Sequence, residues 1–517
     1  MENVTLATFI KVIRKPSLRA LARTAYLGLI MSCLLTSCTV GPDYVRPPVS
    51  VPAKFKEARG KSFLLANNKD WKIAEPRDHF DRGEWWKLFH DPQLNALETQ
   101  LNLYNQNIAN AVANYYQACA IVDQARAGFF PTLTGSFNIL RQKGGGGATT
   151  FNSTSGDMTS LGTATTSVVN PNSPITTTYS AFLNANWEPD IWGLVRRTVE
   201  ANLSSAQASE ALVAVTRLSA QGALAQYYFE LQTLDMDQQL LNNTVRDYKK
   251  ALQLTRNQYK SGTVSQADIL QAQSQLDSAE AEAINNGILR SQYEHAIAVL
   301  MGRPPATFAL AFKPLKATPP IIPVTVPSIW LERRPDVAQA ERLMQQANAQ
   351  IGIAVAAFYP TLNLSGSLST AGRSLGKLIN TPSIGWSYGL QLAETILDGG
   401  LRSATVKAAK AGYAASVATY RQTVLTAFQD VEDNLVNLRL LKEQSLALNR
   451  AAMTARKALR LISNQYKAGT IPYSSVITAE ITAFTTQKSA NDVMGLQMTA
   501  AVGLIKALGG GWSTQDM

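Results

Sequence analysis

The sequence contains few of the residues that build metal centres and disulfide networks. Its 517 residues include three cysteines and three histidines. The histidines lie in unrelated contexts, without the spacing of a metal site: His79, His90 and His295. We therefore expect no metal site and no cofactor.

Catalytic signatures are equally scarce. Gly372–Gly376 matches the pattern of a hydrolase nucleophile elbow, but an elbow needs a strand before it and a helix after it. Here strand-like patterns lie on both sides. The glycine run at 144–147 lacks the lysine and the hydroxyl residue of a phosphate-binding loop. These absences argue against an enzyme.

Long apolar runs are also missing. No stretch of about eighteen apolar residues occurs, so we do not expect a spanning helix. A shorter apolar stretch, "AYLGLIMSCLL", follows five basic residues near the N-terminus, which is the order of a secretory signal. The five basic residues are Lys11, Arg14, Lys15, Arg19 and Arg23.

The apolar stretch ends in Leu35-Thr36-Ser37-Cys38, which looks like a bacterial lipobox. We expect cleavage before Cys38 and its acylation, for example with palmitate, as a membrane anchor. The alternative is an ordinary signal peptide followed by a chance cysteine. Cys119 is then left as a single thiol, interpreted as a small buried residue or as a cross-linking site.

The charge is positive but dispersed. The formal net charge of +11 falls to +7 without residues 1–37, which carry five basic side chains and one acidic one. The remaining basic residues are scattered among acidic ones, with no basic and aromatic cluster. We therefore expect no nucleic-acid partner.

A repeat organises the rest of the chain. "NQYKSGT" at 257–263 recurs as "NQYKAGT" at 464–470, 207 residues later. "FPTL" at 130–133 recurs as "YPTL" at 359–362, 229 residues later. The extra 22 residues lie in the Gly/Ser/Thr-rich segment 143–178, which corresponds to the shorter segment 371–384 of the second copy. The chain is therefore predicted to contain two copies of one unit.

Each copy carries two stretches of alternating apolar and polar residues, which predict strands around 133–139, 181–187, 362–368 and 386–392. Such strands are typical of outer-membrane proteins, although a pair of hairpins in a soluble sandwich has the same pattern. Four strands cannot close a barrel, and lipid does not tolerate open edges, so a membrane sheet needs further chains. Counting alone allows two chains or three.

Helical patterns cover about 92–128, 191–301, 332–357 and 401–507, with a Pro-rich link at 303–328. Ala and Gln occur where a bundle core would place Leu, which indicates either a tube wall one helix thick or an exposed coiled-coil stalk.

The repeated heptapeptide is predicted to form a tight turn between long helices. Gly262 and Gly469 are expected to end one helix in the left-handed conformation. Ser265 and Asp268 form a predicted capping box for the next helix, and Pro472 is acceptable in a first turn.

Several motifs together make the chain resemble the TolC-type outer membrane factors, specifically the lipoprotein, NodT-like branch that serves RND-type tripartite efflux systems. They are "CTVGPDYVRPPV" (38–49), "WWKLFHDPQLNAL" (85–97), "WEPDIWGLVRR" (187–197), "VPSIWLERRPDVAQAE" (326–341), "LDGGLR" (397–402) and "KALGGGW" (506–512). The resemblance implies an α+β fold with a long α-helical barrel and a membrane β-barrel, four strands per chain, closed only in the homotrimer. It also implies outer membrane lipid, a periplasmic adaptor protein and an inner-membrane RND-type transporter as partners.

The same resemblance places the two turns at periplasmic tips that contact the adaptor and narrow to a gate. The adaptor-contact candidates are Tyr259, Lys260, Gly262, Tyr466, Lys467 and Gly469. The gate candidates are Tyr466, Asp268, Ser474 and Thr478. Family members carry a bulky apolar residue and an aspartate where this chain has Ser474 and Thr478, which puts an acidic ring from the second repeat in doubt. Asp268 is either a helix cap or a pore-lining carboxylate, or both.

The resulting division is a signal peptide (1–37), a lipid-anchored N-terminal segment (38–90), a first repeat (91–301), a Pro-rich linker of the equatorial region (302–331), a second repeat (332–508) and a C-terminal tail (509–517). The expected function is that of an outer membrane exit duct, which passively conducts small molecules out of the periplasm. The alternative is a lipid-anchored coiled-coil structural protein or adhesin without a pore. The sequence does not indicate which solute passes.

Overall fold

The structure is a computed structural model that describes residues 39–49, 52, 55–57, 83–143, 175–322, 334–378 and 384–510. The chain forms two compact units. The first, called the sheet unit here, comprises Met1–Asp43, Ile121–Ala201 and Asn348–Lys410. The remainder, Tyr44–Ala120, Asn202–Ala347 and Ala411–Met517, is called the helical unit.

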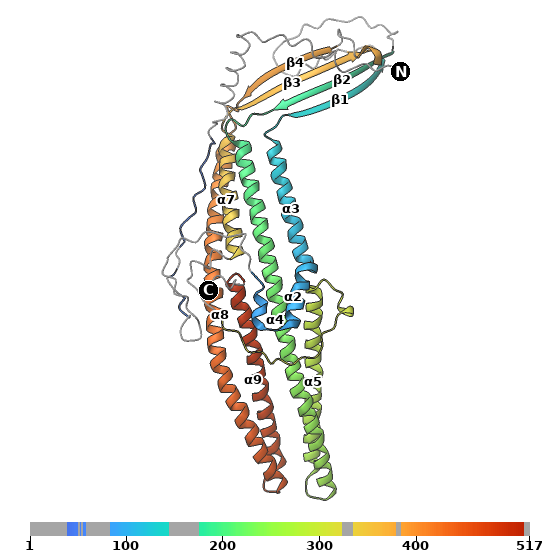
Figure 1. The fold of residues 1–517 in the computed structure, drawn as a ribbon, viewed down its shortest axis with the longest axis vertical. Coiled ribbons are helices and arrows are strands. Elements are labelled where there is room, and N and C mark those ends of the chain that lie inside the picture. The colour runs from blue at the N-terminus through green and yellow to red at the C-terminus, as the bar shows by residue number, and fades with distance from the viewer. Residues whose placement is uncertain are drawn as a thin grey trace, which may run out of the picture. The chain divides into compact units, whose positions relative to one another are not determined.

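The sheet unit contains a four-stranded antiparallel sheet in the order β1-β2-β3-β4 (Figure 1). The strands are β1 Thr132–Lys143, β2 Ile175–Trp187, β3 Thr361–Gly372 and β4 Ile384–Ala393. All four predicted strands are confirmed. The strands extend into the predicted loops, since β2 already begins at Ile175, inside 143–178. Residues 144–174, including the glycine run, lie outside the described part of the chain.

The sheet is open, because β1 and β4 each pair with one neighbour only within the described residues. Along β4 the large side chains alternate with small or polar ones, and Trp386, Tyr388 and Leu390 are 72%, 83% and 67% exposed in the single chain. The rings of Trp386 and Tyr388 stack with their centroids 5.8 Å apart. Within the described residues, one chain therefore leaves both sheet edges unpaired and the large side chains of β4 exposed.

The long helices confirm the duplication. Helix α4 (Leu194–Lys260) and helix α8 (Leu401–Lys467) both have 67 residues, and α5 (Gln266–Leu300) and α9 (Tyr473–Ala507) both have 35. A straight helix of that longer kind spans about 100 Å. Each long helix is followed by its shorter partner, so the two repeats contribute the hairpins α4–α5 and α8–α9.

The predicted helix at 92–128 is wrong in one respect, because the structure has two helices there, α2 (Pro92–Tyr104) and α3 (Gln106–Ala127). Asn105 interrupts them in an extended conformation. Its Oδ1 accepts a hydrogen bond from the amide of Ile108 at 3.0 Å, and its Nδ2 donates to the carbonyl of Leu300 at 2.8 Å. A polar residue that caps the second helix therefore ends the first.

The remaining described elements are one helix, which has 22 residues like α3 and precedes β3 as α3 precedes β1, and three short turns. They are α7 (Pro335–Ala356) and the 3-10 turns η1 (Trp85–Phe89), η2 (Pro305–Thr307) and η3 (Leu375–Lys377). The main core of the helical unit joins η1 and α2 to α4, α5 and α9, with Phe89, Phe229 and Leu504 among its buried residues. Across the described ranges, no helix combines the length and apolarity needed to cross a membrane.

Candidate functional site at the helical hairpin turns

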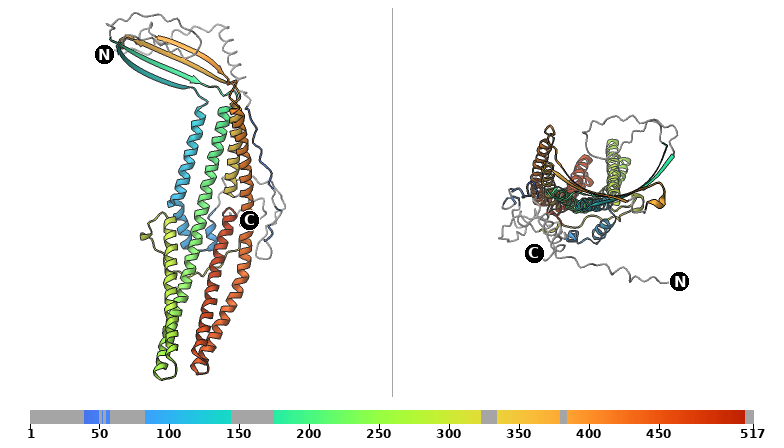
Figure 2. Two further views of the ribbon diagram at one scale, coloured as in Figure 1. Left: turned by 180° about the vertical axis from the view of Figure 1, so that it is seen from behind. Right: turned by 90° about the horizontal axis from the view of Figure 1, so that it is seen from above.

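The two hairpin turns are built alike. Both lie at the same end of the helical unit (Figures 1 and 2). Gly262 and Gly469 have φ values of +77° and +75°, so both glycines adopt the predicted left-handed conformation. In the first turn the amide of Gly262 donates to the carbonyl of Tyr259 at 2.9 Å, and the amide of Thr263 donates to that of Gln258 at 3.0 Å. These bonds are the Schellman pattern, which satisfies the last carbonyls of α4.

The second turn has the same bonds, from Gly469 to Tyr466 at 2.9 Å and from Thr470 to Gln465 at 3.1 Å. Apart from the glycine itself and its chain neighbours, no described heavy atom lies within 4 Å of a Cβ placed on Gly262 or Gly469. The backbone conformation, and not crowding, therefore requires glycine at both positions.

The helices that follow begin differently. The Ser265 side chain accepts a hydrogen bond from the amide of Asp268, and the Asp268 carboxylate accepts one from the amide of Ser265 at 2.8 Å, which confirms the predicted capping box. Pro472 was predicted to fit in the first turn of the second helix, but it lies one residue before that helix begins at Tyr473. It occupies the N-cap of α9 with ψ 156° and offers no side-chain cap.

A hydrogen bond joins the two hairpins beside the turns. The hydroxyl of Tyr466 on α8 donates to Oε1 of Gln258 on α4 at 2.6 Å. The Tyr466 ring contacts that of Tyr473, with centroids 5.3 Å apart, at the edge of an apolar cluster that includes Tyr248 and Val476. Burial raises the pKa of the Tyr466 phenol, and the nearby Asp268 carboxylate raises it further. The hydroxyl therefore stays protonated as a donor.

The other predicted site residues are distributed around this contact. Tyr259, the counterpart of Tyr466, is 46% exposed, and Lys260 and Lys467 are exposed in the last turns of α4 and α8. Ser474 and Thr478 are exposed on α9, where the Thr478 hydroxyl donates to the Ser474 carbonyl at 3.0 Å. The structure thus brings Tyr466 and Asp268 into electrostatic contact. The predicted signal peptide and Cys38 lie outside the described residues.

Sequence reasoning missed the residues that join the hairpins. Gln258 belongs to the repeated motif itself, but the repeat gives no sign that it bonds to the other copy. Glu480 was also missed, although it follows Val476, Ile477 and Ala479, which are all buried. A carboxyl group next to such a buried face is a signal that the sequence contained.

A second polar contact joins α4 and α9. Asp237 is 1% exposed, and its Oδ1 accepts a hydrogen bond from Nδ2 of Asn491 at 2.8 Å. Lys488 lies 3.4 Å from Asp237 Oδ2 and 3.2 Å from Asp492 Oδ2. Burial raises the pKa of Asp237 to about 6, although Asn491 and Lys488 oppose that shift.

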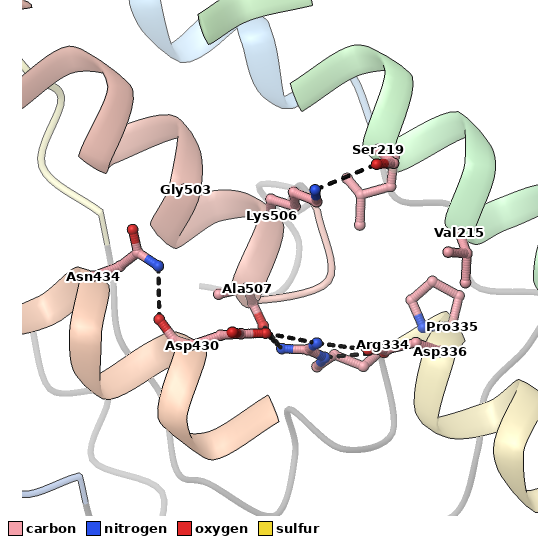
Figure 3. A pocket seen from close by; sticks show the side chains of 11 residues that line it. Val215, Ser219, Arg334, Pro335, Asp336, Asp430, Asn434, Gly503, Lys506 and Ala507 are labelled. Atoms are coloured by element: carbon pink, nitrogen blue, oxygen red, sulfur yellow. Dashed lines mark hydrogen bonds and ion pairs between the residues drawn. The ribbon is translucent and has the colours of Figure 1, made fainter. Parts of the chain in front are cut away.

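A cavity of about 340 Å³ lies where the start of α7 meets α4, α8 and α9 (Figure 3). Arg334 forms ion pairs with Asp336 at 2.6 Å and with Asp430 at 3.1 Å, and it donates to the carbonyl of Ala507 at 3.2 Å. Burial alone would lower the pKa of Arg334, but the two carboxylates outweigh it and the pKa is raised. This charge is compensated, so we interpret the arginine as a structural link.

Comparison with known proteins agrees with this architecture. The family model described as "Outer membrane efflux protein" matches residues 98–303 and 326–510, one segment for each repeat. The toluene efflux pump outer membrane protein TtgC of Pseudomonas putida is 28% identical over 504 residues, covering 96% of each chain. Nodulation protein T of Rhizobium leguminosarum bv. trifolii is 27% identical over 471 residues, covering 90% of this chain and 93% of its own.

A solved structure has the same fold. The open state of the MtrE outer membrane channel of Neisseria gonorrhoeae superposes with a TM-score of 0.73 and 27% identity, over 92% of this chain and 98% of that one. These similarities confirm the predicted resemblance and displace the alternative of an anchored stalk without a pore. The chain therefore belongs to the outer membrane efflux protein family, as an outer membrane channel of tripartite efflux systems and not an enzyme.

Proposed function

We propose that three copies of this chain form one exit duct, through which small molecules pass passively from the periplasm to the exterior. The open four-stranded sheet with its exposed apolar face carries this proposal. Lipid does not tolerate unpaired strand edges, so β1 of one chain must pair with β4 of the next. Three chains then give a barrel of twelve strands, within the size range of outer-membrane barrels.

The hairpin turns serve as the periplasmic gate and the adaptor-contact surface in this proposal. The bond between Tyr466 and Gln258 supports a gate role, because it holds the two hairpins of one chain together at their ends. Asp268 supplies a carboxylate beside that bond, whereas Ser474 and Thr478 supply only hydroxyl groups. The turn residues themselves meet the adaptor, which couples the duct to an inner-membrane RND-type transporter.

The lipid anchor is proposed at Cys38. The segment that follows it is held in the sheet unit, where the amide of Val40 donates to the carbonyl of Trp192 at 3.2 Å. Arg197 on α4 pairs with Asp43 at 2.8 Å. Trp192 lies only five residues after the end of β2, so Val40, two residues after Cys38 in the sequence, is bonded near the end of a strand. This placement suits an anchor in the outer membrane, with the hairpins in the periplasm.

We extend the proposal to the division of the chain. Residues 38–90 form the anchored N-terminal segment, 91–301 and 332–508 the two repeats, and 302–331 the equatorial linker. Lys313 Nζ in the linker forms an ion pair with Asp91 Oδ2 at 2.7 Å. This ion pair fixes the linker to the start of the first repeat.

Native mass spectrometry and single-channel recording in planar bilayers test the duct together. We expect a trimer that gives ion-conducting steps. A monomer would contradict the closed barrel, and a trimer that never conducts would contradict the duct. Mass analysis of the N-terminal peptide tests the anchor separately, with acylated Cys38 expected in the wild type and loss of the acyl chain in Cys38→Ser.

A further inference from the structure

A cavity of about 760 Å³ separates the two hairpins of the chain near their turns. Its walls come from α4 of the first hairpin and from α8 and α9 of the second. Tyr248 and Tyr473, each 5% exposed, form buried parts of the wall. The cavity is therefore a place where the hairpins face each other without being fully packed.

Glu480 of α9 lines this cavity. Its Oε2 atom is buried and has no hydrogen-bond partner, and among the described residues Glu480 has no ion pair. Burial, together with the like charge of the Asp247 carboxylate across the cavity, raises the pKa of the Glu480 carboxyl to about 7. An ionised Glu480 is thus poorly solvated while the hairpins stay together.

No other charged group within the described ranges neutralises this carboxyl. The basic side chains on the wall are exposed and can remain in water, and Lys250 lies 3.7 Å from Asp247 instead. The titratable groups that face the cavity region are Asp247, Tyr248 and Lys250 of α4, Glu282 of α5 acting through Tyr248, Arg456, Arg460, Tyr466 and Lys467 of α8, and Tyr473 of α9.

We propose that Glu480 is a proton-dependent latch: its neutral form is compatible with the hairpin contact, and its ionised form favours separation of α9 from α4. The inference rests on the proposed gate at the hairpin ends. Separation lets water reach the carboxylate, so opening the contact releases a proton. By linkage, a group that binds its proton more tightly in the closed contact shifts the equilibrium toward opening as the pH rises.

A neighbouring group acts in the same direction. Asp237, also between α4 and α9, has a pKa raised by burial, so it too binds its proton more tightly while the contact is closed, although Lys488 and Asn491 partly compensate its charge. Asp237 has a pKa of about 6, which is lower than that of Glu480, so the contributions of the two carboxyl groups can be distinguished by their pH ranges. Glu480 dominates the response above that range.

The test is the open probability of the trimer in planar bilayers between pH 6 and pH 8. For one group whose pKa falls from about 7 to its ordinary value on opening, we expect an increase of up to about tenfold per chain. Glu480→Gln cannot ionise and should abolish most of this increase. Glu443→Gln, which changes an exposed carboxylate on α8, should keep it. An unchanged pH response in Glu480→Gln would overturn the latch.

Asp247→Asn keeps Glu480 and removes the like charge beside it. The midpoint of the response should then move to lower pH, and a fixed midpoint would contradict the proposed geometry. Because Asp247 is exposed, this variant also covers the case in which Glu480→Gln fails to assemble.

Hydrogen exchange gives a readout that does not depend on conduction. The intrinsic dependence of exchange on pH cancels in the ratio of wild type to Glu480→Gln for peptides covering residues 465–480. We expect that ratio to rise between pH 6 and pH 8. A channel that never conducts but shows this rise would contradict the duct and retain the latch, whereas a constant ratio would overturn the latch in either case.

Discussion

The hydroxyl of Tyr466 donates a hydrogen bond to Oε1 of Gln258 at 2.6 Å, although the two residues occupy different positions of the same repeated heptapeptide. The counterpart of Tyr466 is Tyr259, which is 46% exposed. The duplication therefore supplies two equal turns, and the contact between the hairpins uses them unequally. This asymmetry makes Tyr466, rather than Tyr259, the residue that we propose holds the two hairpins together.

Tyr466→Phe removes this hydroxyl and keeps the ring packed against Tyr473. A hydrogen bond of this kind contributes about 0.5–1.5 kcal/mol, so the ratio of open to closed channels should rise about twofold to tenfold. Single-channel recording at constant pH measures the effect. Tyr259→Phe is the matched control from the other repeat and should leave the ratio unchanged. Equal effects of the two substitutions would contradict a holding role for Tyr466.

The sequence predicted the duplication, the four strands and both turns, because each depends on local chemistry. Alternation sets the strands, and a glycine with positive φ ends α4 and α8. The sequence did not predict the break at Asn105, where one helical pattern divides into two helices. The Asn105 side chain there donates a hydrogen bond to the carbonyl of Leu300, which is distant in the sequence. Contacts between the hairpins could not be predicted either, since the pairing of Gln258 with Tyr466 depends on how four helices pack.

Gly262→Ala should destabilise the first hairpin by about 1 kcal/mol, because φ of +77° is unfavourable for a residue with a Cβ. Gly287→Ala is the matched control on α5, where the glycine is helical and an added Cβ meets nothing within 4 Å. That variant should gain about 0.5–1 kcal/mol from helix propensity. Thermal unfolding of the two variants measures the loss of stability in the first and the gain in the second. Shifts of the same sign would show that the turn does not require the left-handed conformation.

Leu390→Arg tests the lipid-facing side of the sheet. Leu390 is 67% exposed in one chain and shares a face of β4 with Trp386 and Tyr388. An arginine on the lipid face costs about 2–4 kcal/mol at the middle of the bilayer, so the trimer should insert and assemble poorly. Gln391→Arg, one residue later and on the other face, should assemble normally. The yield of trimers recovered from outer membranes compares the two variants. Equal yields from Leu390→Arg and Gln391→Arg would contradict the assigned faces.

Glu98 makes the stability of the helical unit depend on pH. It is 0% exposed on α2 among the buried residues Leu94, Leu97 and Leu101, and neither carboxylate oxygen has a hydrogen-bond partner within the described part of the chain. Burial raises the pKa of this carboxyl well above its usual range. Since the folded state binds the proton more tightly than the unfolded state, this group stabilises the fold at low pH, and that stability is lost as the pH rises toward the folded-state pKa.

Glu98→Gln keeps the shape of the side chain and removes the titration. Within the window between the unfolded and folded pKa, the wild type should lose on the order of 1.4 kcal/mol per pH unit relative to the variant. Denaturant unfolding between pH 5 and pH 8 should therefore give curves that diverge as the pH rises, with the variant more stable at pH 8. Glu443→Gln, an exposed carboxylate, should run parallel to the wild type. Parallel curves for Glu98→Gln as well would mean that Glu98 is ionised in the folded chain, and that a compensating positive charge must lie beside it.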